Sequence, residues 1–209
     1  MRTKHAAVLA VALAAALLAV PAASARPTGH GGGGLLGGLL GGLLGGNCQS
    51  GGDRVFAPWG DFNDYWLIPN GGLELGSRDW TLSGGASVAS GNEPFLPTGR
   101  YSLSLPSGSS ATTGSVCIGP NNPYVRFFAA DDGGTDAGLH VRVIWYGLLN
   151  NVLGSTDVST YAGGSGWAPQ SQLRSSGGVN VLIPLLGSTS ARIEFTPLGS
   201  GSNWQVDDV

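Results

Sequence analysis

Residues 139–147 read LHVRVIWYG, and this stretch decides the fold class. Its side chains alternate between two sets. One set is Leu139, Val141, Val143 and Trp145, and the other is His140, Arg142, Ile144 and Tyr146. A period of two places successive side chains on opposite faces of an extended chain. The stretch therefore predicts a half-buried β-strand with the first set facing inward.

The same alternation recurs on both sides of this strand. YSLSL at 101–105 alternates Tyr101, Leu103 and Leu105 with serines, and ARIEF at 191–195 alternates apolar residues with Arg192 and Glu194. Clusters of Gly, Pro, Asn and Ser separate these stretches, which is the composition of turns. No segment combines a helical period with capping residues. The sequence thus predicts an all-β domain.

The length of the domain narrows its architecture. About 160 residues follow Asn47, enough for one packed domain with roughly eight to ten short strands. Such strands bury one face each in a two-sheet sandwich. At this length we expect a jelly roll rather than an immunoglobulin-type domain, whose Cys and Trp spacing is missing.

Three segments precede or form that domain. Residues 1–25 combine Arg2 and Lys4 with an apolar run and a small-residue triplet, which predicts a signal peptide cleaved after Ala25. An uncleaved membrane anchor is the alternative, although the run is short for a full span. Residues 26–46 form a Gly/Leu-rich low-complexity spacer. Its leucine pairs could also associate with a lipid, a wall polymer or each other. Residues 47–209 form the single β-sandwich domain.

The charge of the exported chain limits its partners. Cleavage removes two of the ten basic residues and none of the thirteen acidic ones, so the formal net charge falls to -5. No lysine remains and the arginines are scattered, so we expect no nucleic-acid partner. No later segment has the length and hydrophobicity of a transmembrane span.

The chain has two cysteines, Cys48 and Cys117, and both follow the cleavage site. An even cysteine count in a secreted chain predicts one disulfide. In the chain-entropy model a loop of this length stabilises the fold by about 4 kcal/mol.

Three further pieces occur in a set order. They are NGGLELGSRDW at 70–80, GRYSLSL at 99–105 and WQVDDV at 204–209. In this order they resemble the pattern of secreted carbohydrate-binding modules of the galactose-binding-like jelly-roll type, especially families 4, 9 and 22. The resemblance covers residues 69–209 and implies the same fold. It departs from the family at Leu73, where the family favours Phe.

The resemblance also implies a structural calcium site. In the family, a glutamate of the first strand and a nearby main-chain carbonyl meet a carboxylate of the last strand. Carried over, the ligands are the Glu74 side chain, the Gly72 carbonyl and Asp207, with Asp208 as the neighbouring choice. Calcium accepts carboxylates and carbonyls together. The alternative is that Glu74 faces solvent or pairs with an arginine.

The sequence gives no support for catalysis. A glycosidase needs two carboxylates across a cleft, but the exported chain has only three glutamates and its aspartates cluster in glycine-rich turns. No nucleophile elbow with triad partners and no phosphate-binding loop occurs. We therefore expect a protein that is not an enzyme.

A ligand-binding face is predicted from two strands. If residues 124–130 and 139–147 are antiparallel neighbours, five side chains share one outer face: Arg126, Phe128, His140, Arg142 and Tyr146. Aromatic rings stack on sugar rings, and arginine and histidine hydrogen-bond to hydroxyl groups. The alternatives are an ordinary solvent-facing sheet or a face covered by the aromatic segment 56–70. Most of the aromatic side chains of that segment should pack over a sheet edge or end, and one or two could line a site. They are Trp59, Phe62, Tyr65 and Trp66.

Together these observations predict a secreted, non-catalytic module that binds a polysaccharide or cell-surface glycan weakly. The alternative is a structural or surface protein-interaction domain that keeps the jelly-roll fold without a sugar site. Ligand choice in such a fold depends on loops and a few exposed aromatic residues.

Overall fold

The computed structural model of the chain describes residues 51–97, 99–118, 122–131, 138–147, 150–162, 166–174 and 189–209. These residues belong to one compact unit, Gly34–Val209. The predicted signal peptide, the spacer and Cys48 lie outside the described residues. Within the described part of the chain, no helix has the length and apolar character needed to cross a membrane.

The described residues form an all-β fold with one short 3₁₀ helix, η1 (Ala57–Trp59). The strands in chain order are β1 (Trp80–Ser83), β2 (Ser87–Ser90), β3 (Tyr101–Pro106), β4 (Ser110–Thr113), β5 (Val116–Ile118), β6 (Tyr124–Val125), β7 (Phe128–Asp131), β8 (Gly138–Tyr146), β9 (Val152–Ala162), β10 (Ala168–Pro169), β11 (Leu173–Arg174), β12 (Thr189–Leu198) and β13 (Asn203–Asp207).

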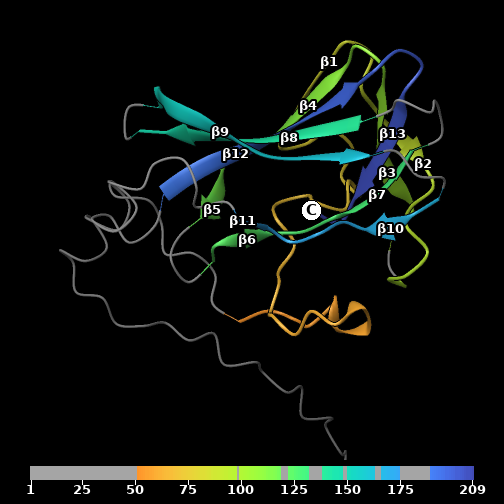
Figure 1. Cartoon of the computed structure of the whole chain (residues 1–209), viewed down its shortest axis with the longest axis vertical. Coiled ribbons are helices and arrows are strands. Elements are labelled where there is room, and N and C mark those ends of the chain that lie inside the picture. Colours follow the sequence, from red (N-terminus) through yellow and green to blue (C-terminus); the bar gives the residue numbers. More distant parts are fainter. Residues whose placement is uncertain are drawn as a thin grey trace, which may run out of the picture. The chain divides into compact units, whose positions relative to one another are not determined.

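Two antiparallel sheets pack as the predicted jelly-roll sandwich (Figure 1). The six-stranded sheet has the order β1-β4-β12-β8-β9, with β5 also paired to β12. The five-stranded sheet has the order β10-β7-β13-β3-β2. A small third sheet pairs β6 with β11. The predicted all-β fold and two-sheet sandwich are therefore confirmed.

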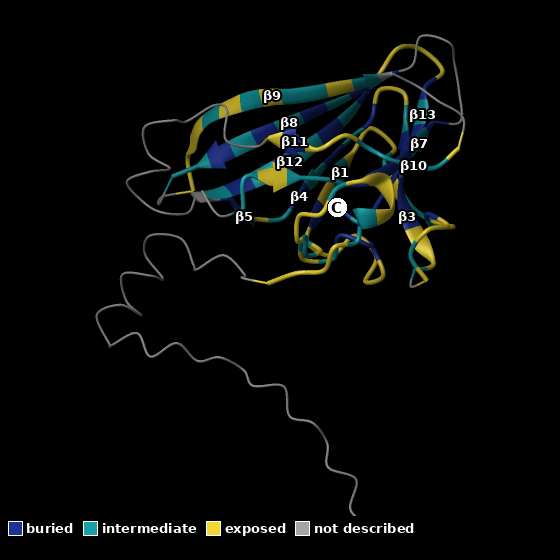
Figure 2. Ribbon diagram, turned by 60° about the horizontal axis from the view of Figure 1, so that its bottom comes forward, coloured by how far each residue is buried: buried dark blue, intermediate teal, exposed yellow. Residues whose placement is uncertain are grey.

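The core lies between the inner faces of the two sheets. Along β8, buried residues alternate with partly exposed ones as the sequence predicts (Figure 2). Val143 and Trp145 of β8 pack in one cluster with Phe195 of β12 and Trp204 of β13. Each fully buried side chain of this kind contributes about 1.5–3 kcal/mol of transfer free energy. Tyr101 departs from the prediction because it begins β3 and is exposed.

The expected pairing of residues 124–130 with 139–147 is wrong. β7 pairs with β13 and β10, whereas β8 pairs with β12 and β9 in the other sheet. The lengths of the strands account for this. The nine residues of β8 find partners of ten and eleven residues in β12 and β9, but β7 has only four. The predicted turn at 132–137 lies outside the described residues.

The aromatic segment before β1 covers the outer face of β7. A β-bridge between Asp53 and Tyr65 closes the segment into a loop. Phe56, inside this loop, is buried and lies 5.1 Å from Phe128 between ring centroids. The face that carries Phe128 is thus covered by residues 53–65, which was one of the alternatives for it.

Candidate functional site

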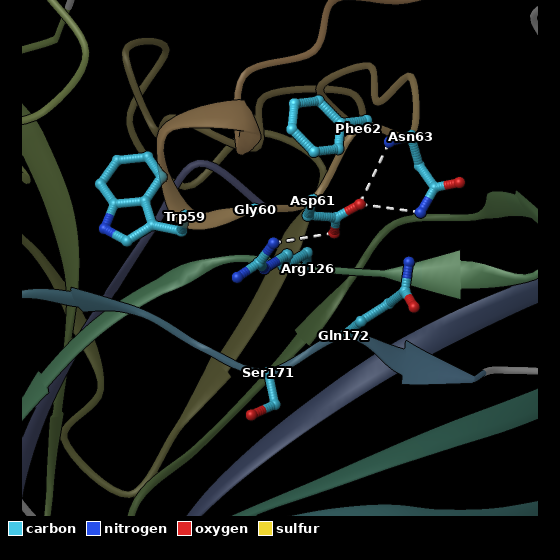
Figure 3. Close-up of a pocket in the computed structure, with 8 residues that line it drawn as sticks. All are labelled: Trp59, Gly60, Asp61, Phe62, Asn63, Arg126, Ser171 and Gln172. Atoms are coloured by element: carbon cyan, nitrogen blue, oxygen red, sulfur yellow. Dashed lines mark hydrogen bonds and ion pairs between the residues drawn. The ribbon is translucent and has the colours of Figure 1, made fainter.

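An open pocket of about 540 Å³ lies where residues 53–65, the N-terminal loop, meet two connections of the sandwich (Figure 3). The loop supplies five of the eight lining residues, and the β6–β7 and β10–β11 connections supply the rest. The lining residues are Trp59, Gly60, Asp61, Phe62, Asn63, Arg126, Ser171 and Gln172.

Local sequence shapes the rim of this pocket. Pro58 lies in the first turn of η1, where its missing N–H costs nothing. Gly60 ends the helix in the left-handed conformation at φ 79°, and its N–H donates to the Ala57 carbonyl. Asp61 then accepts a hydrogen bond from the Asn63 backbone N–H at 3.1 Å, which tightens the next turn. Trp59 and Phe62, on either side of this turn in the sequence, both line the pocket.

An ion pair forms the floor of the pocket. Arg126 Nη1 lies 2.7 Å from Asp61 Oδ2, and the two side chains are only 9% and 12% exposed. Arg126 Nε donates to the Gln170 carbonyl at 2.8 Å. The guanidinium also lies 4.4 Å above the centroid of the Phe56 ring, a cation–π distance. These contacts join the N-terminal loop to the β6–β7 and β10–β11 connections.

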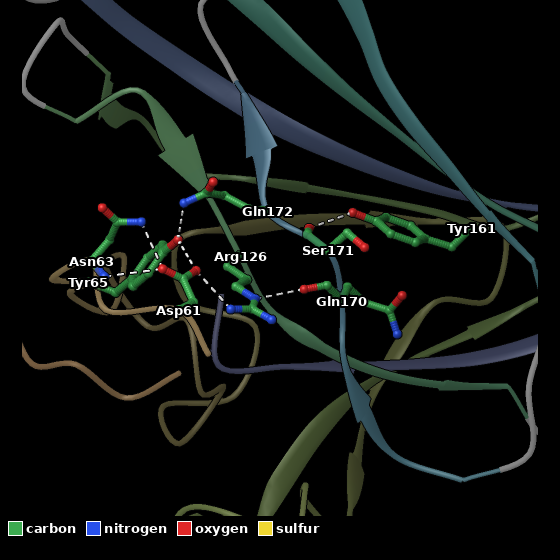
Figure 4. Close-up of polar contacts among 8 residues, drawn as sticks. All are labelled: Asp61, Asn63, Tyr65, Arg126, Tyr161, Gln170, Ser171 and Gln172. Carbon is green, nitrogen blue, oxygen red and sulfur yellow. Dashed lines mark hydrogen bonds and ion pairs between the residues drawn. The ribbon is translucent and has the colours of Figure 1, made fainter. Parts of the chain in front are cut away.

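Tyr65 and Gln172 extend this network (Figure 4). The Tyr65 hydroxyl donates to Asp61 Oδ2 at 2.7 Å and accepts from Gln172 Nε2 at 2.7 Å. Burial and the hydrogen bond to Asp61 raise the pKa of Tyr65 to about 12. Burial pushes the pKa of Asp61 upward, but hydrogen bonds from Tyr65 and Asn63 outweigh it and hold that pKa below its ordinary value. At neutral pH the network therefore contains the neutral phenol of Tyr65 and the ionised carboxylate of Asp61.

Two aromatic rings remain accessible at the pocket. Trp59 is 37% exposed and Phe62 is 66% exposed. Trp59 is held in place by edge contacts with Phe95 and Phe128, at centroid distances of 5.1 and 5.6 Å. Fixed rings beside hydrogen-bonding groups form the arrangement that binds a sugar ring through its apolar face and its hydroxyls.

The structure separates the five residues predicted to share one ligand face. Arg126 lines the pocket. Phe128 is fully buried under the N-terminal loop, so its predicted outward position is wrong. The other three residues, His140, Arg142 and Tyr146, lie on the outer face of β8 in the opposite sheet.

Those three side chains have partners of their own. His140 Nε2 lies 2.9 Å from Asp157 Oδ1, and Arg142 Nη2 lies 2.5 Å from Glu194 Oε1. The Arg192 guanidinium lies 4.5 Å above the Tyr146 ring, which occupies one aromatic face. These three side chains are therefore paired, on a strand whose register with β9 shifts between Val141 and Arg142 and again between Trp145 and Tyr146.

The predicted calcium ligands come together near the final strand. Glu74 lies in a run of turns rather than in the expected first strand, and its Oε1 accepts backbone N–H groups of Arg100 and Tyr101 at 2.6 and 3.1 Å. A Cβ added to Gly72 would lie 2.9 Å from Asp208 Oδ1, so this carboxylate packs directly against that glycine. Gly72 and Asp208 therefore lie side by side, and calcium binding at this place stays a prediction.

A fourth carboxylate, Glu93, joins the cluster and was not predicted. Glu93 and Asp207 are buried, and the Glu93 N–H donates to Asp207 Oδ2 at 3.2 Å. Burial and the charge of Asp208 raise the pKa of Asp207 to about 8. Burial and the neighbouring Glu93 raise the pKa of Asp208 to about 7. The cluster therefore retains protons near neutral pH, and its carboxylates repel one another once they are ionised.

The oxygen-rich donor set suits calcium, but the side chains do not converge on one position. Among the described residues, no group of three or more His, Cys, Asp or Glu side chains is arranged to hold a metal ion. Both Glu93 oxygens accept backbone N–H groups, from Phe95 at 2.5 Å and Leu96 at 2.7 Å. A bound calcium would require the side chains to rearrange.

The disulfide prediction falls partly outside the described residues. Cys117 lies on β5, and the described part of the chain contains no free cysteine. Cys48 lies outside that part, so the pairing stays a prediction.

Sequence reasoning missed several pocket residues. Asp61 and Gln172 belong to polar segments without a motif, and the partners that give them a role are distant in sequence. The density of aromatic residues at 56–66 was the available signal, and it indicated only that one or two could line a site.

No protein-family model matches the sequence, and a search of curated proteins gave no significant match. Among solved structures, the chain is similar to TmCBM61 in complex with β-1,4-galactotriose, at 20% identity and a TM-score of 0.43 over 69% of this chain and 96% of that one. It is similar to CBM28, a module specific for non-crystalline cellulose, at 16% identity and a TM-score of 0.46. The match covers 69% of this chain and 93% of that one. It is also similar to the C-terminal family 22 module of Clostridium thermocellum Xyn10B, at 14% identity and a TM-score of 0.39. That match covers 68% of this chain and 90% of that one.

Proposed function

We propose that the protein is a secreted, non-catalytic module that binds a polysaccharide or cell-surface glycan weakly, in the pocket between the N-terminal loop and the β10–β11 connection. The observation that carries this proposal is the pairing of two accessible aromatic rings, Trp59 and Phe62, with polar groups in one open pocket of about 540 Å³. The predicted signal peptide and the Cys48–Cys117 disulfide belong to the same proposal.

The geometry suits binding better than hydrolysis. Asp61 is the only lining carboxylate in the described part of the chain, and it accepts four hydrogen bonds that hold it ionised. A glycosidase of the usual kind needs a second carboxylate across the cleft to act as acid or nucleophile. The described residues that line this pocket include no second carboxylate. A shallow site with one or two stacking rings should give a Kd on the order of micromolar to millimolar.

Phe62 is the sharpest test because it lies in the pocket and is mostly exposed. A glycan array and insoluble-polysaccharide pull-downs first identify a retained glycan. Phe62→Ala should then weaken its retention about tenfold, equal to ~1.4 kcal/mol, with an unchanged melting temperature. Tyr101→Ala is the matched control, since Tyr101 is an exposed aromatic residue on β3, away from the pocket.

The outer face of β8 is the alternative location, and Tyr146→Ala tests it. We expect this variant to retain the glycan as the wild type does, because the Tyr146 ring is already covered by Arg192. Loss of retention in Tyr146→Ala but not in Phe62→Ala would move the site to the β8 face. If no glycan is retained, the protein belongs to the surface-interaction class.

We also propose that calcium binds the carboxylate cluster and has a structural role there. Support comes from the chemistry of Glu74, Asp207 and Asp208, which gather hard oxygen donors beside Glu93. A divalent cation would relieve the mutual repulsion of these groups. The Gly72 carbonyl remains a further proposed ligand.

A further inference from the structure

We infer that the pocket, if it binds glycans as proposed, selects uncharged sugars and discriminates against uronates and other anionic sugars. This inference rests on the proposed function and concerns the ligand class of the same site.

The first argument is the charge of the lining. Among the described residues, Asp61 and Arg126 are the only charged ones that line the pocket, and their 2.7 Å contact neutralises both. The nearby Arg54 is itself paired with Asp64 at 3.3 Å. A site for an anion requires excess positive charge or several converging donors. Here the Arg126 guanidinium is already paired with the Asp61 carboxylate.

The second argument is that the Asp61–Arg126 ion pair is hard to break. Arg126 is nine-tenths buried and is fixed by the Gln170 carbonyl as well as by Asp61. Asp61 is held in turn by Tyr65 and by both nitrogens of Asn63. An anionic sugar could displace the buried Asp61 carboxylate from its hydrogen bonds. Otherwise it would lie close to that carboxylate without a positive charge of its own to pair with. Either route costs free energy that an uncharged sugar avoids.

The third argument is the mixture of hydrogen-bonding groups that remains. Arg126 Nη2 has no hydrogen-bond partner among the described residues and can donate. Gln172 donates its amide N–H to Tyr65, which leaves its carbonyl oxygen as an acceptor. Ser171 adds a hydroxyl, and Trp59 adds an apolar surface (Figure 3). Each sugar hydroxyl both donates and accepts, so such a mixture matches a neutral sugar better than a carboxylate, which only accepts.

The test uses one ligand in two charge states. A neutral oligosaccharide retained by the full exported chain is compared with the same oligosaccharide after oxidation of its primary alcohols to carboxylates. Calorimetric titration should give a Kd for the neutral form that changes less than about twofold between 50 and 500 mM NaCl. The oxidised form should bind at least about tenfold more weakly.

Asp61→Asn removes the compensating charge and keeps the shape of the side chain. The oxidised ligand should then gain affinity, and its binding should weaken with salt. Asp64→Asn removes the same charge from the exposed pair with Arg54 and should leave the Kd of both ligands unchanged. If Asp61→Asn does not fold, the comparison of the two ligands with wild type decides the matter.

The outcomes separate the two proposals. Tighter binding of the oxidised ligand by the wild type would overturn the inference and leave glycan binding in place. Binding of neither form would overturn glycan binding and this inference together.

Discussion

Asp61 shows how a single residue can organise a site that no motif announces. Its carboxylate accepts hydrogen bonds from Asn63, Tyr65 and Arg126. Because Arg126 is 65 positions away, the local sequence around Asp61 gives no indication of this role. Arg126 was predicted as a ligand residue, and it does line the pocket, but through a different face and different neighbours.

Removal of Asp61 should destabilise the fold as well as the pocket. Asp61→Ala leaves the buried Arg126 guanidinium without its counter-charge, so we expect a loss of about 3 kcal/mol in the free energy of unfolding. Urea unfolding measures this loss. Asp64→Ala breaks the exposed pair with Arg54 and should cost less than about 1 kcal/mol. Equal losses in the two variants would show that the Asp61–Arg126 pair contributes no more than a surface pair.

At the scale of elements, the sequence was informative about strands and uninformative about their neighbours. The alternation in β8 and in residues 191–195 of β12 predicted which residues are buried, because a period of two reports the two faces of a strand directly. Phe128 was misplaced because the outer face of its strand is covered by a loop more than 60 residues earlier in the chain. The alternation of side chains along β7 cannot indicate that a distant loop packs on its outer face.

Turns between strands provide a second element-scale prediction. Gly84, between β1 and β2, has a φ of 62°, and a Cβ there would lie 2.8 Å from the Cα of Ser109 in the turn between β3 and β4. Gly84→Ala should therefore separate two turns and strain the backbone, with an expected loss of about 3 kcal/mol.

Gly76→Ala is the matched control for this substitution. Gly76 has a similar φ of 65°, but an added Cβ would meet nothing within 4 Å. The free energy of unfolding of Gly76→Ala should fall by only about 1 kcal/mol, which is the cost of placing alanine in the left-handed conformation. Thermal unfolding of both variants measures the difference, and equal losses would mean that the contact between the turns is unimportant.

At the scale of the whole molecule, the final residues are joined to the segment before β1. The Ile68 N–H donates to the Val209 carbonyl at 3.0 Å, and the Val209 N–H donates to the Gly71 carbonyl at 3.4 Å. The carboxylate cluster lies at this junction. The resemblance predicted three of its acidic residues, but Glu93 could not be found because its approach depends on how the β2–β3 connection folds.

The cluster gives the metal-free protein an unusual pH dependence. Asp207 has a pKa of about 8 in the folded state against an ordinary value of 3.8, so the folded state binds protons more tightly than the unfolded chain. The stability that this group contributes is therefore fully present below about pH 4 and is lost as the pH rises through about 8. Melting in the presence of a chelator should occur at a higher temperature at pH 5 than at pH 8. Asp207→Asn should reduce this difference, whereas a rise in melting temperature from pH 5 to pH 8 would contradict the proposed repulsion.

Calcium at pH 8 should replace the protons that the cluster loses. At a hundredfold excess over its Kd it would add about 2.7 kcal/mol to the free energy of unfolding. In Glu74→Ala this gain should disappear. An unchanged melting curve for the wild type would assign Glu74 the plain role of accepting the N–H groups of Arg100 and Tyr101.

The central claim is that a glycan binds in the pocket beside Trp59, and an NMR titration with a retained oligosaccharide tests it most directly. The Trp59 indole N–H and the Gln172 side-chain amide should shift progressively, because both residues line the pocket. The backbone amides of His140, Arg142 and Tyr146 should stay in place, because β8 lies in the other sheet. Shifts confined to those β8 residues, with Trp59 and Gln172 unmoved, would contradict the claim.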